Sequence, residues 1–146
     1  MSDAREIVAR LELEPHPEGG WFRETWRAAP NGAERSPGTA IYFLLEAGQR
    51  SHWHTVDATE IWLFHAGDPL TLSLAEGRDG PVADISLGPD VLSGHLPQAV
   101  VPQDTWQAAE PDPNGQEGYS LVACIVVPAF EFDGFTLAPP GWAPGR

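Results

Sequence analysis

The sequence predicts an all-β protein, a single domain of the barrel, sandwich or jelly-roll type with one short helix at its N-terminal end. Glycine and proline number 15 each among 146 residues and are spread along the chain, which is typical of a protein with many turns. Short apolar stretches with strand-like composition lie between these turn signals. No second helical pattern interrupts them, so parallel β-α-β units are not expected.

The N-terminal helix is expected within residues 1–13, with Asp3 as its N-cap and Glu6 at the spacing of a capping box. Pro15 and the glycines that follow indicate a turn after it. The barrel is expected over residues 20–135 and a surface tail over 138–146, all within one domain of residues 1–146.

The predicted strands follow one another through the barrel region and are separated by turn signals, one of them at residues 30–32. Their expected ranges are 21–27, 39–45, 52–56, 60–66, 70–75, 82–87, 99–101, 105–109 and 119–127.

The charge balance excludes two classes of partner. Eight arginines and no lysine stand against 21 acidic residues, which gives a formal net charge of −13. Nucleic acids and anionic membranes both require a basic surface, so neither is expected as a partner. The single cysteine, Cys124, lies in an apolar stretch and is expected to be a buried thiol. The N-terminal residues show no apolar signal segment, and a cytoplasmic location is expected.

The segment from Ser51 to Gly67 carries the residues best suited to chemistry. On a regular strand His52 and His54 leave the same face, with Cα atoms about 6.5 Å apart, so both imidazoles can converge on one metal ion. Glu60 aligns with aromatic residues at period two and is expected to face the interior, where a carboxylate needs a partner. That partner is a metal ion, a proton or a structural arginine, Arg23 or Arg50.

This segment resembles the first motif of the cupin superfamily, small jelly-roll barrels with a pocket inside. Residues 55–59 separate His54 from Glu60, more than is usual in that motif, so Asp57 is an alternative to Glu60. Pro102 to Gln107 stands where the second motif is expected, with Gln107 in place of the usual last histidine. The wider pattern is similar to the Cupin 5 branch, of unknown function, over nearly the whole chain. It is carried by residues 16–25, 39–45, 51–54, 60–62, 101–109 and 130–132.

The resemblance implies a cupin jelly roll similar to sugar-nucleotide epimerases, a homodimer, and a pocket floor made by His52, His54, Glu60 and Gln107. These four residues are the expected ligands of one divalent metal, Zn, Ni, Mn or Fe(II), and without a metal they form a hydrogen-bonding floor.

Candidate substrate-binding residues surround that floor. Tyr42 and Trp62 are expected in its wall, and Gln107 can read a ligand edge. Either Arg23 or Glu24 faces the pocket, because the two alternate on one strand, and an inward Arg23 would bind a carboxylate or phosphate. His16 is expected to be structural.

The expected function is therefore binding of a small polar metabolite, sugar-, nucleotide- or carboxylate-like. If the protein is an enzyme, His54 and Glu60 are the candidate catalytic residues, for metal-assisted or isomerase-like proton transfer. The alternatives are a metal-free metabolite binder and a structural protein without activity.

Overall fold

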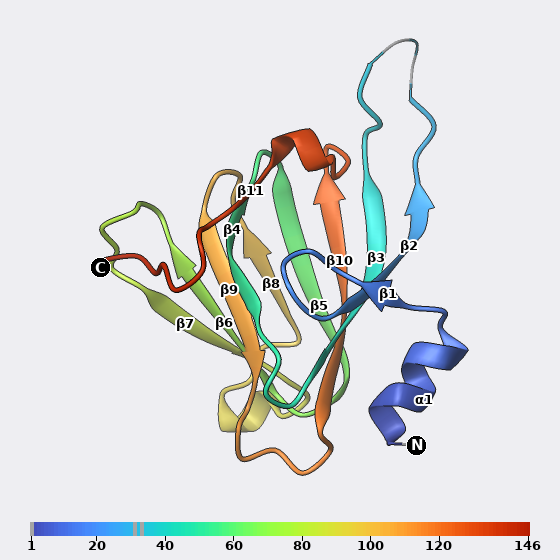
Figure 1. Ribbon diagram of the computed structural model, residues 1–146, viewed down its shortest axis with the longest axis vertical. Coiled ribbons are helices and arrows are strands. Elements are labelled where there is room, and N and C mark those ends of the chain that lie inside the picture. The colour runs from blue at the N-terminus through green and yellow to red at the C-terminus, as the bar shows by residue number, and fades with distance from the viewer. Residues whose placement is uncertain (1, 31, 33) are drawn as a thin grey trace.

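Two antiparallel β-sheets face each other in the computed structural model, which describes residues 2–30, 32 and 34–146 (Figure 1). The six-stranded sheet has the order β1-β2-β3-β10-β5-β8, and the five-stranded sheet has the order β11-β4-β9-β6-β7. Strands distant in sequence are neighbours in both sheets, as in a jelly roll. The fold class predicted from the sequence is confirmed.

The elements of the six-stranded sheet are β1 (Glu14–Pro15), β2 (Trp21–Arg27), β3 (Thr39–Glu46), β5 (Thr59–Gly67), β8 (Gln98–Val101) and β10 (Tyr119–Val127). The other sheet contains β4 (Ser51–Val56), β6 (Leu70–Ala75), β7 (Ala83–Leu87), β9 (Trp106–Pro111) and β11 (Phe135–Leu137). Helix α1 spans Asp3–Arg10, and two 3₁₀ turns, η1 (Val91–Ser93) and η2 (Phe132–Gly134), complete the molecule.

Helix α1 is shorter than the expected 1–13, and its N-cap is Ser2 rather than Asp3. The Ser2 hydroxyl accepts the backbone N–H of Arg5 at 3.2 Å, which leaves Asp3 inside the first turn, where its charge favours the helix dipole. Leu11 caps the other end, and Glu12 then has a φ of 56° that no helix continues through. No helix in the described part of the chain is long and apolar enough to cross a membrane.

Each predicted strand is present within one or two residues of its expected bounds. β10 shows why: it is an apolar run between turn signals, and burial alternates along it with Val122, Cys124 and Val126 on the buried face. β1 and β11 were not expected, because two or three residues carry too little periodicity to be recognised. Asn31 of the predicted turn at 30–32 lies outside the described residues.

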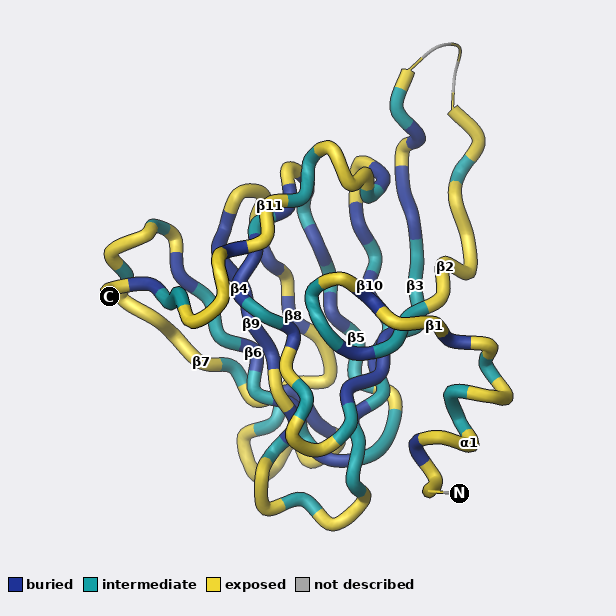
Figure 2. The backbone as a smooth tube through the Cα atoms, viewed as in Figure 1, coloured by how far each residue is buried: buried dark blue, intermediate teal, exposed yellow. Residues whose placement is uncertain are grey.

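The main core fills the space between the two sheets (Figure 2). Trp62, Phe43 and Leu72 are among its largest fully buried side chains, and Phe43 meets the Trp62 ring edge to face at 5.9 Å. A second cluster joins α1 to the outer face of β3 through Ala4, Leu13 and Leu44. Side chains fill one end of the barrel less completely, and the cavity described below opens there.

The C-terminal segment lies on the surface, as expected, but it is held in place. The backbone N–H of Ala138 donates to the Trp53 carbonyl at 2.9 Å, and the Trp142 ring packs on Trp106 at 4.4 Å. Further along, Gly145 donates its N–H to the Arg78 carbonyl. These contacts cover the outer face of β4 and β9.

Candidate functional site

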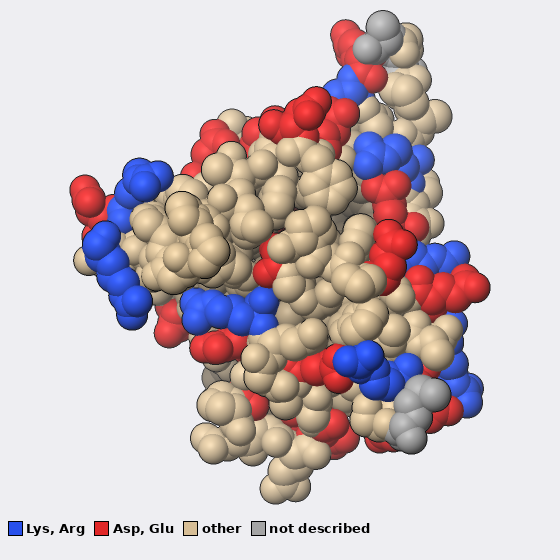
Figure 3. All heavy atoms as spheres, in the orientation of Figure 1, with Lys and Arg blue, Asp and Glu red and all other residues tan. Residues whose placement is uncertain are grey.

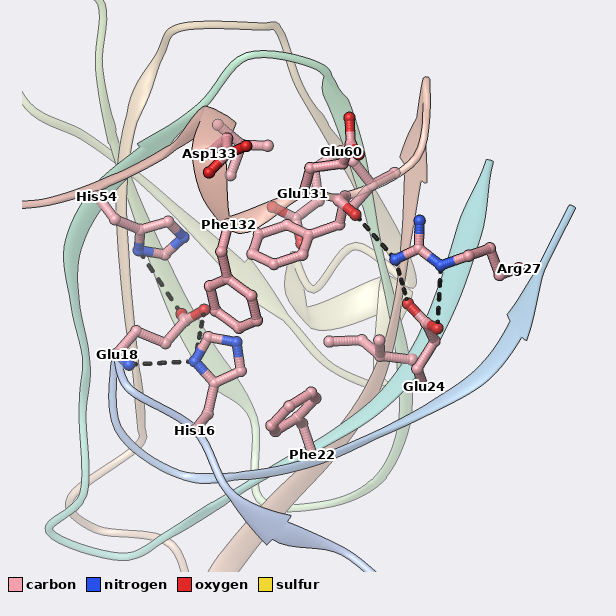
Figure 4. A pocket seen from close by; sticks show the side chains of 14 residues that line it. His16, Glu18, Phe22, Glu24, Arg27, His54, Glu60, Glu131, Phe132 and Asp133 are labelled. Carbon is pink, nitrogen blue, oxygen red and sulfur yellow. Dashed lines mark hydrogen bonds and ion pairs between the residues drawn. The ribbon is translucent and has the colours of Figure 1, made fainter. Parts of the chain in front are cut away.

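A cavity of about 340 Å³ opens at the end of the barrel where β2, β4 and β5 approach the η2 turn (Figure 4). Its lining combines titratable side chains with a larger apolar and aromatic surface. The lining residues are His16, Glu18, Phe22, Glu24, Arg27, Ile41, His54, Val56, Glu60, Val126, Phe130, Glu131, Phe132 and Asp133.

His54 reaches the cavity because β4 carries a bulge. Ser51 pairs with Ala109 and His54 with Gln107, so three steps along β4 match two along β9. His54 is therefore only 1% exposed and faces inward. The expectation that His52 shares this face is wrong, because the bulge reverses the parity of the strand. The His52 ring instead contacts the Pro139 carbonyl, with Nε2 2.9 Å from the oxygen.

Glu60, rather than Asp57, is the inward carboxyl. Glu60 lies on β5, across the barrel from His54, and is 7% exposed. Its Oε1 accepts the amide N–H of Gln107 at 2.9 Å, while the Gln107 carbonyl accepts the Trp62 indole N–H at 2.9 Å. Asp57 lies outside and receives two hydrogen bonds from Arg35.

Glu18 and His16 belong to the site, although His16 was expected to be structural and Glu18 was not singled out. Glu18 Oε2 accepts the Ser51 hydroxyl and lies 3.6 Å from His54 Nδ1, while Glu18 Oε1 lies 3.3 Å from His16 Nδ1. Gly19 makes this possible: its φ is 110°, and a Cβ there would lie 2.1 Å from the Arg50 carbonyl oxygen. The pair of glycines after Glu18 was the available sequence signal, and it indicated only a turn.

Burial shifts the pKa values of all four inward groups toward their neutral forms. It raises the pKa of Glu18 to about 8, against the opposing hydrogen bond from Ser51. It raises the pKa of Glu60 to about 7, with His54 opposing and Glu18 adding to the shift. It lowers the pKa of His16 to about 4, with His54 adding, and also lowers the pKa of His54. At neutral pH the site is therefore a set of neutral imidazoles beside a Glu18 carboxyl that largely retains its proton and a Glu60 carboxyl that is close to half-protonated.

The tautomer of His54 follows from its backbone contact. Nδ1 lies 2.8 Å from the His52 carbonyl oxygen, an acceptor only, so Nδ1 carries the proton. Nε2 then carries a lone pair, and Figure 4 shows this second ring nitrogen on the cavity side. No hydrogen bond to Nε2 occurs among the described residues.

The rim settles which of Arg23 and Glu24 faces the cavity. Glu24 lines it and binds Arg27, with 2.7 Å between Glu24 Oε1 and the guanidinium. Arg23 points away and donates to the Leu11 carbonyl at 3.3 Å. The Arg23 guanidinium therefore does not reach the cavity, and the role considered for it, binding a carboxylate or phosphate of the ligand, is wrong.

Two further candidate residues lie outside the cavity. Tyr42 packs in the cluster between β3 and α1, because β3 turns it away from the barrel interior. Trp62 is fully buried in the main core and reaches the site only through its hydrogen bond to Gln107.

The four predicted metal ligands do not fit a metal ion. His52 points away from the cavity, and Gln107, whose carbonyl accepts the Trp62 indole N–H, is not among the residues that line it. Over residues 2–30, 32 and 34–146 no group of three or more His, Cys, Asp and Glu side chains is arranged to hold a metal. His54 and Glu60 remain as a facing imidazole and carboxyl, a pair suited to proton transfer.

The whole chain is similar to known proteins in sequence and in fold. A family model described as Cupin_5, Cupin superfamily (DUF985), matches residues 5–138. The crystal structure of Protein SO0799 from Shewanella oneidensis is 38% identical, with a TM-score of 0.85 over 94% of this chain and 85% of that one. Uncharacterized protein YML079W of Saccharomyces cerevisiae is 28% identical over 92% of this chain and 75% of its own length.

A more distant likeness concerns the fold alone. A variant of oxalate decarboxylase from Bacillus subtilis has a TM-score of 0.61 and 10% identity, over 84% of this chain and 29% of that one. The same barrel thus occurs in an enzyme, whereas the site residues must be argued from this chain itself.

Proposed function

This chain belongs to the Cupin_5 family of the cupin superfamily (DUF985), and on that premise we propose that it binds a small polar metabolite in the barrel cavity and isomerises it by proton transfer. The observation that carries the proposal is the pairing of His54 and Glu60 on opposite walls of one cavity. A volume of about 340 Å³ suits a small ligand.

The two groups have complementary roles. The lone pair of His54 Nε2 can remove a proton from a carbon beside a carbonyl of the substrate. Burial raises the pKa of Glu60 to about 7, so its protonated form is well populated near neutral pH and can donate a hydrogen bond to the carbonyl oxygen as charge develops there. For an α-hydroxy carbonyl compound, Glu60 passes its proton to the carbonyl oxygen and an enediol forms. Glu60 then takes the proton of the other hydroxyl while His54 returns its proton to the former carbonyl carbon. The carbonyl and hydroxyl groups thus exchange places, and neither a redox partner nor a leaving group is needed.

Neighbouring residues hold these groups in place. The Gln107 N–H fixes Glu60 from one side, and the Glu18 carboxyl lies beside Nδ1 of His54. Such supports orient reacting groups and keep their tautomers fixed.

A divalent metal was the other chemistry considered for this cavity. The engaged carbonyl of Gln107 and the outward position of His52 support a mechanism without a step through a metal. The first test is therefore a binding screen of small sugars and hydroxyketones by thermal shift, run with a chelator present. Stabilisation that occurs only after metal is added contradicts the metal-free version.

The catalytic step is tested by incubating the bound carbonyl compounds in D₂O and following the α-proton by NMR. Wild-type protein should speed exchange, and His54→Gln and Glu60→Gln should slow it by roughly 10²-fold or more. His65→Gln and Glu110→Gln are matched controls at exposed positions of β5 and β9 and should exchange like wild type. Equal exchange by all five proteins would contradict the proposal.

A homodimer is also proposed, and the free edge of β2 supports it. β1 pairs only with Trp21 and Phe22, so the rest of that edge has no strand partner among the described residues, and Trp26 is 56% exposed there. Light scattering coupled to size exclusion tests this: a dimeric mass is expected, and Trp26→Glu should shift it toward the monomer.

A further inference from the structure

The cavity is rich in acidic groups, and its described lining offers no free cation. Five lining residues are carboxylic acids, Glu18, Glu24, Glu60, Glu131 and Asp133, against one arginine, Arg27. That arginine is already engaged, since it binds both carboxylate oxygens of Glu24 and the Phe130 carbonyl. Figure 3 shows acidic side chains gathered over the η2 turn at the rim. Glu24 and Glu131 form ion pairs with Arg27 and Arg35, so a bound carboxylate or phosphate at the rim would face the carboxylate of Asp133 and find no free cation.

The hydrogen-bonding groups of the inner wall also bear on which ligand the cavity accepts. His54 is 1% exposed, and its Nε2, which has no hydrogen-bond partner among the described residues, offers a lone pair to the cavity. One N–H of the Gln107 amide is engaged by Glu60, and Gln107 does not line the cavity. The inner wall thus offers the lone pair of His54 beside the protonated form of Glu60, and the acceptors that await a cation lie at the rim.

The rim supplies aromatic faces. Phe130 and Phe132 lie 4.9 Å apart at an interplanar angle of 85°, and Phe22 lies across from them in the lining. Phenyl faces attract a cation and also pack against an apolar ligand body. The net charge of −13 further raises the local concentration of cations over anions.

We propose that the natural ligand of this cavity is a small organic amine, bound as its ammonium ion at the rim, with the N–H donors directed to Asp133 and the cation over the phenyl faces, which leaves His54 and Glu60 to the carbonyl part. An ammonium group has three donors and no acceptor, which matches a rim that offers a carboxylate and no free cation. The inference rests on the proposed function for the location of the site, and it narrows the substrate to a carbonyl compound that carries an amine.

Three probes of the same shape separate charge from size: cyclohexylamine, cyclohexanol and cyclohexanecarboxylate. Calorimetry on the full chain at low salt should give millimolar or tighter binding of cyclohexylamine, about tenfold tighter than cyclohexanol, and no binding of the carboxylate. Asp133→Asn should weaken amine binding about threefold and leave the alcohol unchanged. Asp79→Asn, an exposed acid outside the cavity, is the matched control and should match wild type.

Equal or tighter binding of the alcohol or of the carboxylate overturns the inference, as does a failure of the amine to bind at millimolar concentration. The deuterium-exchange assay distinguishes this failure from failure of the proposed function. Exchange of an uncharged or anionic carbonyl compound that depends on His54 and Glu60 would leave the proposed isomerase standing while the amine is excluded.

Discussion

The side-chain amide of Gln107 donates to Glu60 at 2.9 Å, and this contact turns a residue expected to bind metal into one that holds a carboxyl. The other end of the same amide accepts the Trp62 indole N–H. A three-residue chain therefore runs from the core to the cavity, and the amide of Gln107 has a partner at each end.

Breaking that chain should cost stability. Gln107→Leu leaves the Trp62 N–H and the Glu60 carboxyl without these partners, so we expect a loss of about 2 kcal/mol or more in the free energy of unfolding. Urea denaturation measures it. Trp62→Phe in the Gln107→Leu background should add less than Trp62→Phe alone, because the indole N–H is already unpaired; strict additivity would contradict the chain.

The buried carboxyls should make stability fall at mildly alkaline pH. Glu18 and Glu60 have folded pKa values of about 8 and 7 against 4.5 in the unfolded chain, so their contribution is complete below pH 4.5 and is lost as pH rises through 7 and 8. His16 acts oppositely: with a folded pKa of about 4 against 6.5, its contribution is present above 6.5 and is lost as pH falls through 4.

Between pH 6.5 and 8 the carboxyls dominate, and the free energy of unfolding should fall by up to about 1.4 kcal/mol per pH unit for each protonated group. Urea titrations across this range test it. Glu18→Gln should make the decline shallower, whereas Glu14→Gln, at an exposed site on β1, should not. A flat profile for wild type would contradict the burial of these groups.

The loop that carries Glu18 should tolerate no side chain at Gly19. Gly19→Ala adds a Cβ 2.1 Å from the Arg50 carbonyl oxygen at a φ of 110°, and a loss of about 3 kcal/mol in unfolding free energy is expected. Gly48→Ala is the control, since its φ of 88° is also positive but nothing lies within 4 Å. It should cost about 1 kcal/mol; equal losses would show that strain alone, without the close contact, explains the effect.

The two histidines of the His-x-His pair, His52 and His54, should differ in function. His54→Asn should abolish deuterium exchange of the bound carbonyl compound, because it removes the inward Nε2. His52→Asn should retain the exchange rate within about twofold, since the His52 ring contacts Pro139 outside the cavity. NMR in D₂O on both variants, with melting temperatures to confirm folding, decides. Loss of exchange in both variants would place His52 in the site.

The sequence predicted the architecture well because strand periodicity and turn residues are local signals, repeated along the chain. The same local periodicity located His54 and Glu60 on strands that face the interior. It did not reveal the bulge in β4, which depends on how β4 pairs with β9, and one extra residue there moved His52 to the outer face. Glu18 was missed because its position depends on Gly19 fitting against Arg50, a contact between loops that periodicity does not encode.

The walls of the cavity come from opposite ends of the polypeptide. His16 and Glu18 precede the first long strand, whereas Phe130 to Asp133 follow β10, the last long one. During synthesis, a ribosome-bound chain released only as far as β10 would hold the acid–base pair in an open trough without its aromatic rim. The capacity to bind ligand is thus acquired only once η2 has been synthesised and has packed back over the open end of the barrel.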